Sequence, residues 1–261
     1  MLLYHAVMDD PPTWIAEFTV SPAGFGEHLR VIADSGRTPL TVGALVRCLT
    51  GQDPLPERPV VITFDDGFAD LPGPTARALA ARGLPATAYL TTGALAPERG
   101  NVRCLLPPAP MMDLRQAAEL EEQGVEVGAH TVSHAQLDTL SPRALRYELG
   151  CAKDVLEQRL GHEVAHLAYP HGYNSPAVRR AARAAGYDSA AAVRHAISSA
   201  DDDAYRIARL ILRHGHTAAD LAAWMRGAGA PRAPFRDAPR TVGWRMYRRA
   251  RAAVRGPVFA G

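Results

Sequence analysis

Short apolar runs alternate with longer amphipathic segments along most of the chain. The apolar runs are rich in Val, Ile, Leu, Ala and aromatic residues, which favours buried strands. They span residues 1–7, 60–64, 86–90, 125–129, 164–169, 187–193 and 206–212. Several amphipathic segments begin at Ser or Asp and end beside Gly, as helices do. Helices are predicted over 24–35, 41–49, 75–82, 113–123, 141–160, 175–186 and 217–226. This alternation indicates an α/β protein with a parallel sheet.

Polar residues follow three of the predicted strands directly. The polar segments are 65–67 (Asp-Asp-Gly), 130–134 (His-Thr-Val-Ser-His) and 170–172 (Pro-His-Gly). If the sheet closes as a barrel, its active site lies at the carboxyl ends of the strands. We therefore expect these three segments to meet at one site.

The residue types in the first two segments are those of a metal site. Asp65 and Asp66 are adjacent, and successive side chains of a strand point in opposite directions, so one can bind a metal while the other faces water or substrate. Asp-Gly is also ordinary turn chemistry. His130 and His134 would share a face if they lay on one helical turn. Two imidazoles and a carboxylate predict one divalent ion, zinc first, with cobalt, nickel or manganese as alternatives.

Composition narrows the class of protein. The 261 residues are 47% hydrophobic and 21% charged, which suits a soluble globular chain with a sizeable core. The net charge of +2 gives no argument for nucleic-acid binding. Three scattered cysteines indicate neither a disulfide scaffold nor a cysteine-based zinc site. With no recognisable signal peptide or membrane-spanning run, we expect a cytoplasmic protein.

The carboxyl-terminal part differs from the rest. Nine arginines and a single acid, Asp237, lie between residues 226 and 255, and Trp244 and Tyr247 are interleaved with them. One interpretation is a partly disordered, solvated tail. The other is a short amphipathic helix that contacts an anionic membrane surface or a partner. We therefore divide the chain into a catalytic domain, 1–228, and an Arg-rich tail, 229–261.

Three motifs in this order resemble those of the polysaccharide deacetylases, carbohydrate esterase family four. Residues 63–67 (Thr-Phe-Asp-Asp-Gly) match the first motif, and 130–134 match the second, H-[ST]-x-x-H. Residues 168–172 (Ala-Tyr-Pro-His-Gly) stand where the third, R-x-P-x-G, belongs, with Ala168 in place of Arg. The opening Tyr4-His5 resembles that of a bacterial subgroup. The resemblance implies a single-domain, deformed (β/α) barrel of about seven parallel strands that removes acetyl groups from N-acetylated amino sugars.

The resemblance also implies residue roles. Asp65 would be the general base, and Asp66, His130 and His134 the metal ligands. Thr131 would orient a ligand or contact acetate, and the backbone N–H of His171 would stabilise the oxyanion. Further contacts with the substrate are expected from Tyr169, Pro170 and Gly172.

Two roles lack a matching motif residue. Arg209, on the last predicted strand, is expected to reach Asp65 in place of the missing third-motif Arg; a surface salt bridge is the alternative. His214 resembles the family's general acid, with His216 close by, and either could instead be a solvated loop residue. His5 is expected near the barrel mouth, with a structural role favoured.

Three functions remain open at this point. The first is a metal-dependent N-deacetylase of an amino sugar in a glycan, oligosaccharide or glycoconjugate. The second keeps the metal site and acts on a non-sugar amide or a cyclic imide. The third is a non-catalytic glycan-binding protein on the same fold, which the absent third-motif Arg favours and the intact ligand set disfavours.

Overall fold

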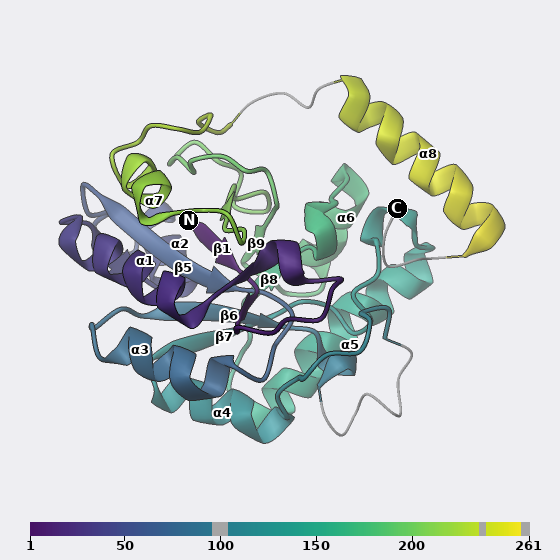
Figure 1. The fold of residues 1–261 in the computed structure, drawn as a ribbon. Helices are drawn as coiled ribbons and strands as arrows, with labels where there is room; N and C mark the ends of the chain where they lie inside the picture. Colours follow the sequence, from purple (N-terminus) through teal and green to yellow (C-terminus); the bar gives the residue numbers. More distant parts are fainter. Residues whose placement is uncertain (96–103, 235–238, 257–261) are drawn as a thin grey trace.

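The computed structural model describes residues 1–95, 104–234 and 239–256, and its centre is a curled parallel sheet (Figure 1). The strand order is β10-β1-β5-β6-β7-β8-β9, and every strand pair is parallel. These strands are β1 (Leu2–Tyr4), β5 (Pro59–Phe64), β6 (Ala86–Leu90), β7 (Val125–Ala129), β8 (His166–Ala168), β9 (Ser189–Ala191) and β10 (Leu210–Ile211). The predicted α/β fold, a deformed barrel of about seven parallel strands, is confirmed.

The segment 207–210 contacts strands at both ends of the strand order. Ile207 forms a parallel bridge with Ala191 of β9, and three residues later Leu210 pairs with Leu2 of β1. The predicted strands 187–193 and 206–212 therefore exist in shortened form. Additional short strands flank the barrel: β4 (Thr38–Leu40) pairs with β5, and β2 (Ala6–Val7) pairs with β3 (Thr19–Val20).

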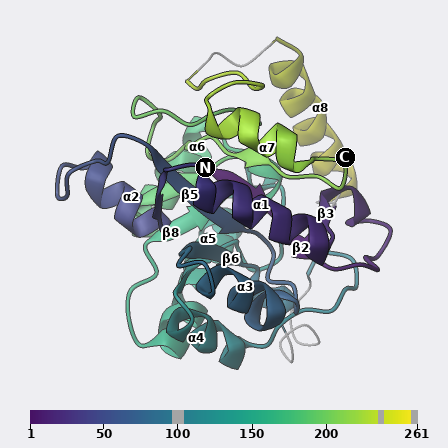
Figure 2. The same cartoon turned by 60° about the vertical axis from the view of Figure 1, so that its left-hand side comes forward.

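Helices surround the sheet, except for the last one, which packs against residues 137–139 at the outer edge of the molecule. They are α1 (Pro22–Asp34), α2 (Val42–Leu49), α3 (Ala76–Ala80), α4 (Leu114–Glu122), α5 (Pro142–Leu160), α6 (Pro176–Ala184), α7 (Ala218–Met225) and α8 (Pro239–Arg255). α1 and α7 are far apart in sequence but lie side by side (Figure 1, Figure 2). None of the helices in the described part of the chain is long and apolar enough to span a bilayer.

The sequence dictates where several helices begin. Ser141 accepts a hydrogen bond from the N–H of Ala144, and Pro142 occupies the first turn of α5. α5 ends at Gly161 in the left-handed conformation. Asp113 and Gln116 form a reciprocal capping box at the start of α4. These local signals explain why the predicted helix boundaries fall within a few residues of those observed.

Strand register places the first residues of the chain beside the first motif. Tyr4 pairs with Phe64, so the next residue on each strand, His5 and Asp65, lies at the same level of the barrel. The backbone N–H of Asp65 donates to the carbonyl of Tyr4 at 3.0 Å. The carboxyl ends of β1 and β5 therefore deliver their polar residues to one edge.

The Arg-rich tail contains a helix. Residues 239–255 form α8, at the outer edge of the molecule in Figure 1. The role of this helix and the boundary of the tail stay predictions.

Candidate active site

Two buried carboxylates follow β5. Asp65 and Asp66 are each only 2% exposed. Asp66 has a positive φ of 76°, and Gly67 follows with a φ of 97°. A side chain at Gly67 would be strained at that φ and would also crowd Leu95. The sharp turn directs the neighbouring carboxylates to different partners.

The two histidines of the second motif lie on an irregular loop after β7, not on a helical turn. Thr131 and His134 have positive φ values of 69° and 60°, so the expectation of a shared helix face is wrong. The loop nevertheless brings the imidazoles together, with 5.0 Å between the ring centroids of His130 and His134. Thr131 Oγ1 accepts a hydrogen bond from the His134 N–H at 3.1 Å, which supports an orienting role.

A buried glutamate on α5 holds this loop in place. Glu148 accepts hydrogen bonds from the backbone N–H groups of Val132 and Ser133, at 3.0 and 2.9 Å, and from the Ser133 hydroxyl. Because it satisfies two loop amides with one carboxylate, Glu148 fixes a conformation that is otherwise costly. Glu148 belongs to none of the three motifs, and its only signal in the sequence is an acidic residue on the inner face of an amphipathic helix.

Asp66, His130 and His134 form the ligand set of a metal site. Asp66 Oδ1 lies 3.2 Å from His134 Nε2 and 3.5 Å from His130 Nε2, and a ligand atom from each residue lies within 4.8 Å of the others. His130 Nδ1 is 2.8 Å from the carbonyl oxygen of Ala168. A carbonyl only accepts, so Nδ1 carries the proton and Nε2 keeps its lone pair for a cation. The residues therefore fit a divalent ion.

Burial and charge set the protonation of this group. Burial lowers the pKa of His130 to about 4, although Asp65 and Asp66 act in the opposite direction. Burial works to raise the pKa of Asp66, but the imidazoles of His134, His5 and His130 outweigh it, and the net pKa lies below its usual range. A carboxylate beside neutral imidazole is the state that binds a metal ion.

The expected contact between Arg209 and Asp65 is present. Arg209 Nη1 and Nη2 donate to the two carboxylate oxygens at 2.6 and 2.8 Å, and both side chains are buried. Burial acts to raise the pKa of Asp65, but Arg209, followed by His130, lowers it overall. Arg209 also donates to the Ala192 carbonyl and to Thr63 Oγ1. It replaces the positive charge that Ala168 cannot supply.

His5 lies beside the carboxylates, and His214 lies on an exposed segment that follows β10. His5 is half-buried, and desolvation lowers its pKa overall, although Asp66 and Asp65 act in the opposite direction. Its Nδ1 has no hydrogen-bond partner among the described residues. His214 is exposed, and its backbone N–H donates to the carbonyl of Glu17. The assignment of His214 as general acid stays a prediction, and the register of β1 against β5 brings His5 to the level of Asp65 as a second candidate.

The third motif contributes a turn and a histidine. The ring centroid of His171 lies 4.7 Å from that of His134, and His171 has a positive φ of 56°. Pro170 is buried, and Gly172 has a φ of 72° where an added Cβ would lie 2.3 Å from Val193 N. Tyr169 is fully buried, and its hydroxyl donates to the Tyr205 carbonyl, so the predicted substrate contact of this ring is wrong.

Backbone strain concentrates at the three motifs. Of the five non-glycine residues with positive φ in the described part of the chain, four belong to them: Asp66, Thr131, His134 and His171. Such conformations cost about 1–3 kcal/mol each and persist only when the surroundings enforce them. Their gathering around the ligand set is typical of a functional site.

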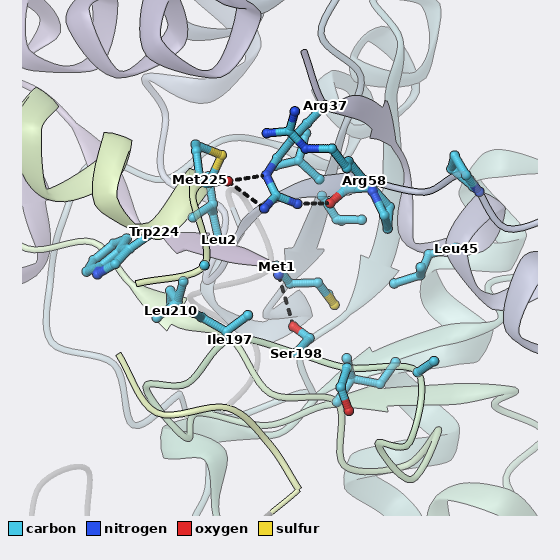
Figure 3. A pocket seen from close by; sticks show the side chains of 18 of the residues that line it. Met1, Leu2, Arg37, Leu45, Arg58, Ile197, Ser198, Leu210, Trp224 and Met225 are labelled. Atoms are coloured by element: carbon cyan, nitrogen blue, oxygen red, sulfur yellow. Dashed lines mark hydrogen bonds between the residues drawn. The ribbon is translucent and has the colours of Figure 1, made fainter. Parts of the chain in front are cut away.

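A cavity of about 360 Å³ lies at the opposite end of the barrel (Figure 3). It is lined by the amino-terminal ends of β1 and β5, and Arg37 bridges there to the carbonyls of Met225 and Pro59. This end of a barrel usually serves stability. The cavity is therefore separate from the chemistry at Asp65 and Asp66.

Comparison with known proteins agrees with this geometry. Residues 52–190 match the family model described as polysaccharide deacetylase. The chain is 23% identical over 225 residues to the polysaccharide deacetylase YxkH of Bacillus subtilis strain 168, covering 86% of this chain and 75% of that one.

Solved structures share the fold. The Streptococcus pyogenes deacetylase PplD, in complex with acetate, is 25% identical with a TM-score of 0.75, covering 86% of this chain and 96% of that one. IcaB from Ammonifex degensii is 20% identical with a TM-score of 0.70, covering 86% and 95%.

Proposed function

The chain belongs to the polysaccharide deacetylase family, and from this premise we propose that it is a metal-dependent hydrolase that removes the N-acetyl group from an amino sugar in a glycan, oligosaccharide or glycoconjugate. One observation carries the proposal: Asp66, His130 and His134 converge within 4.8 Å, with the carboxylate of Asp65 beside them. Three ligands from side chains leave coordination positions open, as a catalytic metal requires.

Asp66, His130 and His134 would hold one divalent ion, and their nitrogen and oxygen donors suit zinc best, with cobalt, nickel or manganese as alternatives. When bound, the ion supplies Lewis-acid polarisation of the acetamide carbonyl and lowers the pKa of water. The Ala168 carbonyl orients His130, and Glu148 holds the loop that carries both histidines. These contacts with the protein interior thus fix the ligand side chains in place before an ion binds.

Asp65 acts as the general base. Its Oδ2 lies 3.8 Å from His130 Nε2, close to the ligand set. Arg209 orients Asp65 through two hydrogen bonds and favours its ionised form. An ionised carboxylate in this place can take a proton from the attacking water. The water oxygen then bonds to the acetyl carbon, and the backbone N–H of His171 is proposed to donate to the oxyanion.

Breakdown of the tetrahedral adduct needs a proton on the departing amine. The C–N bond breaks, acetate leaves, and the sugar nitrogen becomes a free amine. His5 directly follows the neighbouring strand β1 at the level of Asp65, and its Nδ1 has no hydrogen-bond partner within the described ranges, so we assign this proton donation to His5. The assignment rests on the register of β1 against β5, which sets His5 level with Asp65.

The buried base argues against the two other functions considered. A glycan-binding protein has no use for a carboxylate locked in a bidentate pair beside a ligand set, since burial of such a pair is costly. The family membership favours a sugar over a cyclic imide. The third-motif Arg, whose absence favoured a non-catalytic protein, is replaced in space by Arg209.

Acetate release from N-acetylglucosamine oligomers tests the proposal. Activity should disappear on removal of metal with a chelator and return with zinc. Asp65→Asn should retain metal and lose about 10²–10⁴-fold in turnover, because it removes general-base catalysis. Asp154→Asn, an exposed carboxylate on α5, is the matched control and should leave turnover unchanged. Near-full activity of Asp65→Asn would refute the assignment of the base.

A further inference from the structure

The packing of α8 is the reverse of that of an ordinary surface helix, because its polar face points inward. Arg248 is 3% exposed and donates through Nη1 and Nη2 to both carboxylate oxygens of Asp138, at 2.8 and 2.9 Å. Its guanidinium also lies 3.3 Å from the centre of the Tyr173 ring. Arg245, three residues earlier, faces the same carboxylate. A charged anchor, rather than an apolar stripe, therefore fixes the helix to the domain.

The opposite face of α8 is apolar and exposed. Val242, Met246, Ala250 and Val254 are spaced four residues apart and share one side of the helix, away from Arg248. Met246 is 68% exposed and Val254 is 84% exposed, and Tyr247 beside them is 54% exposed. Among the residues that the structure describes, none buries this stripe, which we call the outer stripe of α8.

Charge around the outer stripe has a single sign. α8 contains six arginines and no acidic residue. Arg249 borders the stripe on one side, and Arg240 and Arg251 border it on the other, at helical positions about 100° from its centre. Trp244 stacks on Tyr247 at the edge, with 5.2 Å between ring centroids. Arginines and aromatic rings flanking an apolar face are typical of helices that lie in a membrane interface.

We propose that the outer stripe of α8 binds an anionic lipid surface. The apolar side chains would enter the boundary between headgroups and acyl chains, and the flanking arginines would contact the lipid phosphates. The charge of α8 favours a lipid surface over a protein partner. A protein groove would need acidic residues matched to each arginine, whereas an anionic membrane offers negative charge along the whole helix.

The anchor of α8 lies next to the catalytic residues. Asp138 belongs to the turn η5 (Leu137–Thr139), which begins three residues after His134. Tyr173, under Arg248, stacks on His171 with 5.5 Å between ring centroids. Membrane binding would therefore hold the active site close to the lipid surface. On the proposed function, this favours an amino sugar that is itself carried at a membrane, such as a lipid-linked glycan.

Co-sedimentation of the full chain with vesicles tests the proposal, and it measures binding without reference to activity. Vesicles of equal parts phosphatidylcholine and phosphatidylglycerol should bind the protein, and phosphatidylcholine alone should bind it far more weakly. Met246→Glu combined with Val254→Glu should weaken binding more than about tenfold, because burial of one such side chain is worth at least that factor. Arg240→Gln and Arg249→Gln should each weaken binding about fivefold.

The controls separate this surface from the rest of the molecule. Tyr147→Glu alters an exposed ring on α5 and should leave vesicle binding unchanged. The Met246→Glu and Val254→Glu protein should release acetate from soluble oligomers at the parental rate, so that a failure of binding and a failure of the proposed function are distinguished. Equal sedimentation of parent and variant would overturn the proposal. A concentration-dependent dimer that the variant abolishes would also overturn it and assign the outer stripe to a second copy.

Discussion

Replacement of Arg209 by Met tests the contribution of the buried ion pair that positions the general base, Asp65. The substitution keeps much of the side-chain volume but removes both hydrogen bonds to Asp65. It also removes the donors to Ala192 and Thr63. Asp65 would then be a buried carboxylate without its guanidinium partner, close to His130.

The expected cost at neutral pH is large. Breaking a buried ion pair by removing one partner destabilises a protein by about 3–5 kcal/mol, since the remaining charge is uncompensated. Arg209 is 0% exposed and Asp65 is 2% exposed, so solvent screening reduces this little. Native stabilities are about 5–15 kcal/mol, and the variant should therefore remain folded but with a much lower unfolding midpoint. Turnover should fall at least about a hundredfold, because the base loses its orientation.

The loss of stability in the Arg209→Met variant should depend on pH in a defined direction. In the parent, Arg209 holds the pKa of Asp65 below its unfolded value, so this stabilisation is present above about pH 4 and is lost as pH falls through the folded pKa. In the variant, burial alone raises the pKa of Asp65, so the penalty is present at neutral pH and decreases as Asp65 becomes protonated. The stability difference between parent and variant should therefore narrow as the pH is lowered.

Urea unfolding followed by circular dichroism, at neutral pH and near pH 5, measures both the loss of stability and its dependence on pH. Metal content serves as the internal control and should be unchanged, because Arg209 contacts none of the three ligands. Combining Arg209→Met with Asp65→Asn should recover part of the stability, since the uncompensated charge is gone. Arg209→Lys, which keeps a cation, covers the case in which the Met variant fails to fold. A stability loss that is below about 1 kcal/mol, or that widens in acid, would refute the reasoning.

Two further substitutions separate metal binding from proton transfer. His134→Ala should lose both bound metal and acetate release, measured by metal analysis and an acetate assay, and retention of stoichiometric metal would remove His134 from the ligand set. His5→Gln should keep the metal and lose about a hundredfold or more in turnover, whereas His214→Gln, the matched histidine control, should act like the parent. The opposite ranking of these two variants would restore His214 as the proton donor.

The fold and the meeting of the motifs were predictable because both follow from local signals. Apolar β-branched runs and helix caps such as Asp113 and Ser141 mark the elements without reference to long-range contacts. Once the strands are parallel, their carboxyl ends share one edge, which brings 65–67 and 130–134 together. Asp66 and the two histidines could therefore be predicted as one ligand set.

Loop conformation could not be predicted in the same way. The spacing of His130 and His134 suits a helical turn, yet Thr131 and His134 adopt left-handed backbone. Glu148, eighteen residues after His130 and on another element, supplies the hydrogen bonds that stabilise the loop. A contact of this kind depends on tertiary packing, which overrides the local preference of the segment.

The choice between His5 and His214 depended on strand register. His5 lies within the first predicted strand and His214 follows the last one, and the pattern of apolar residues gives no ranking between them. The pairing of Tyr4 with Phe64 sets His5 level with Asp65, while the chain after β10 carries His214 to an exposed position beside Glu17. Knowing that the first strand lies beside β5 would have been enough to predict His5 at the site. That adjacency and its register, however, depend on pairing across the whole sheet. The cytoplasmic location and the boundary at residue 228 stay predictions.

The replacement of the third-motif Arg by Arg209 shows that the site depends on a cation paired with Asp65, and not on the sequence position that supplies it. Ala168 ends β8 and Arg209 precedes β10, and these two strands lie on opposite sides of β5, the strand that Asp65 follows, in the strand order. Ala168 still serves the site through its carbonyl, which orients His130, a role that does not depend on its side chain. Arg209 extends over Tyr89 to reach Asp65 and satisfies both carboxylate oxygens. A buried base therefore requires a cation with this bidentate geometry, and strands on either side of the barrel can supply it.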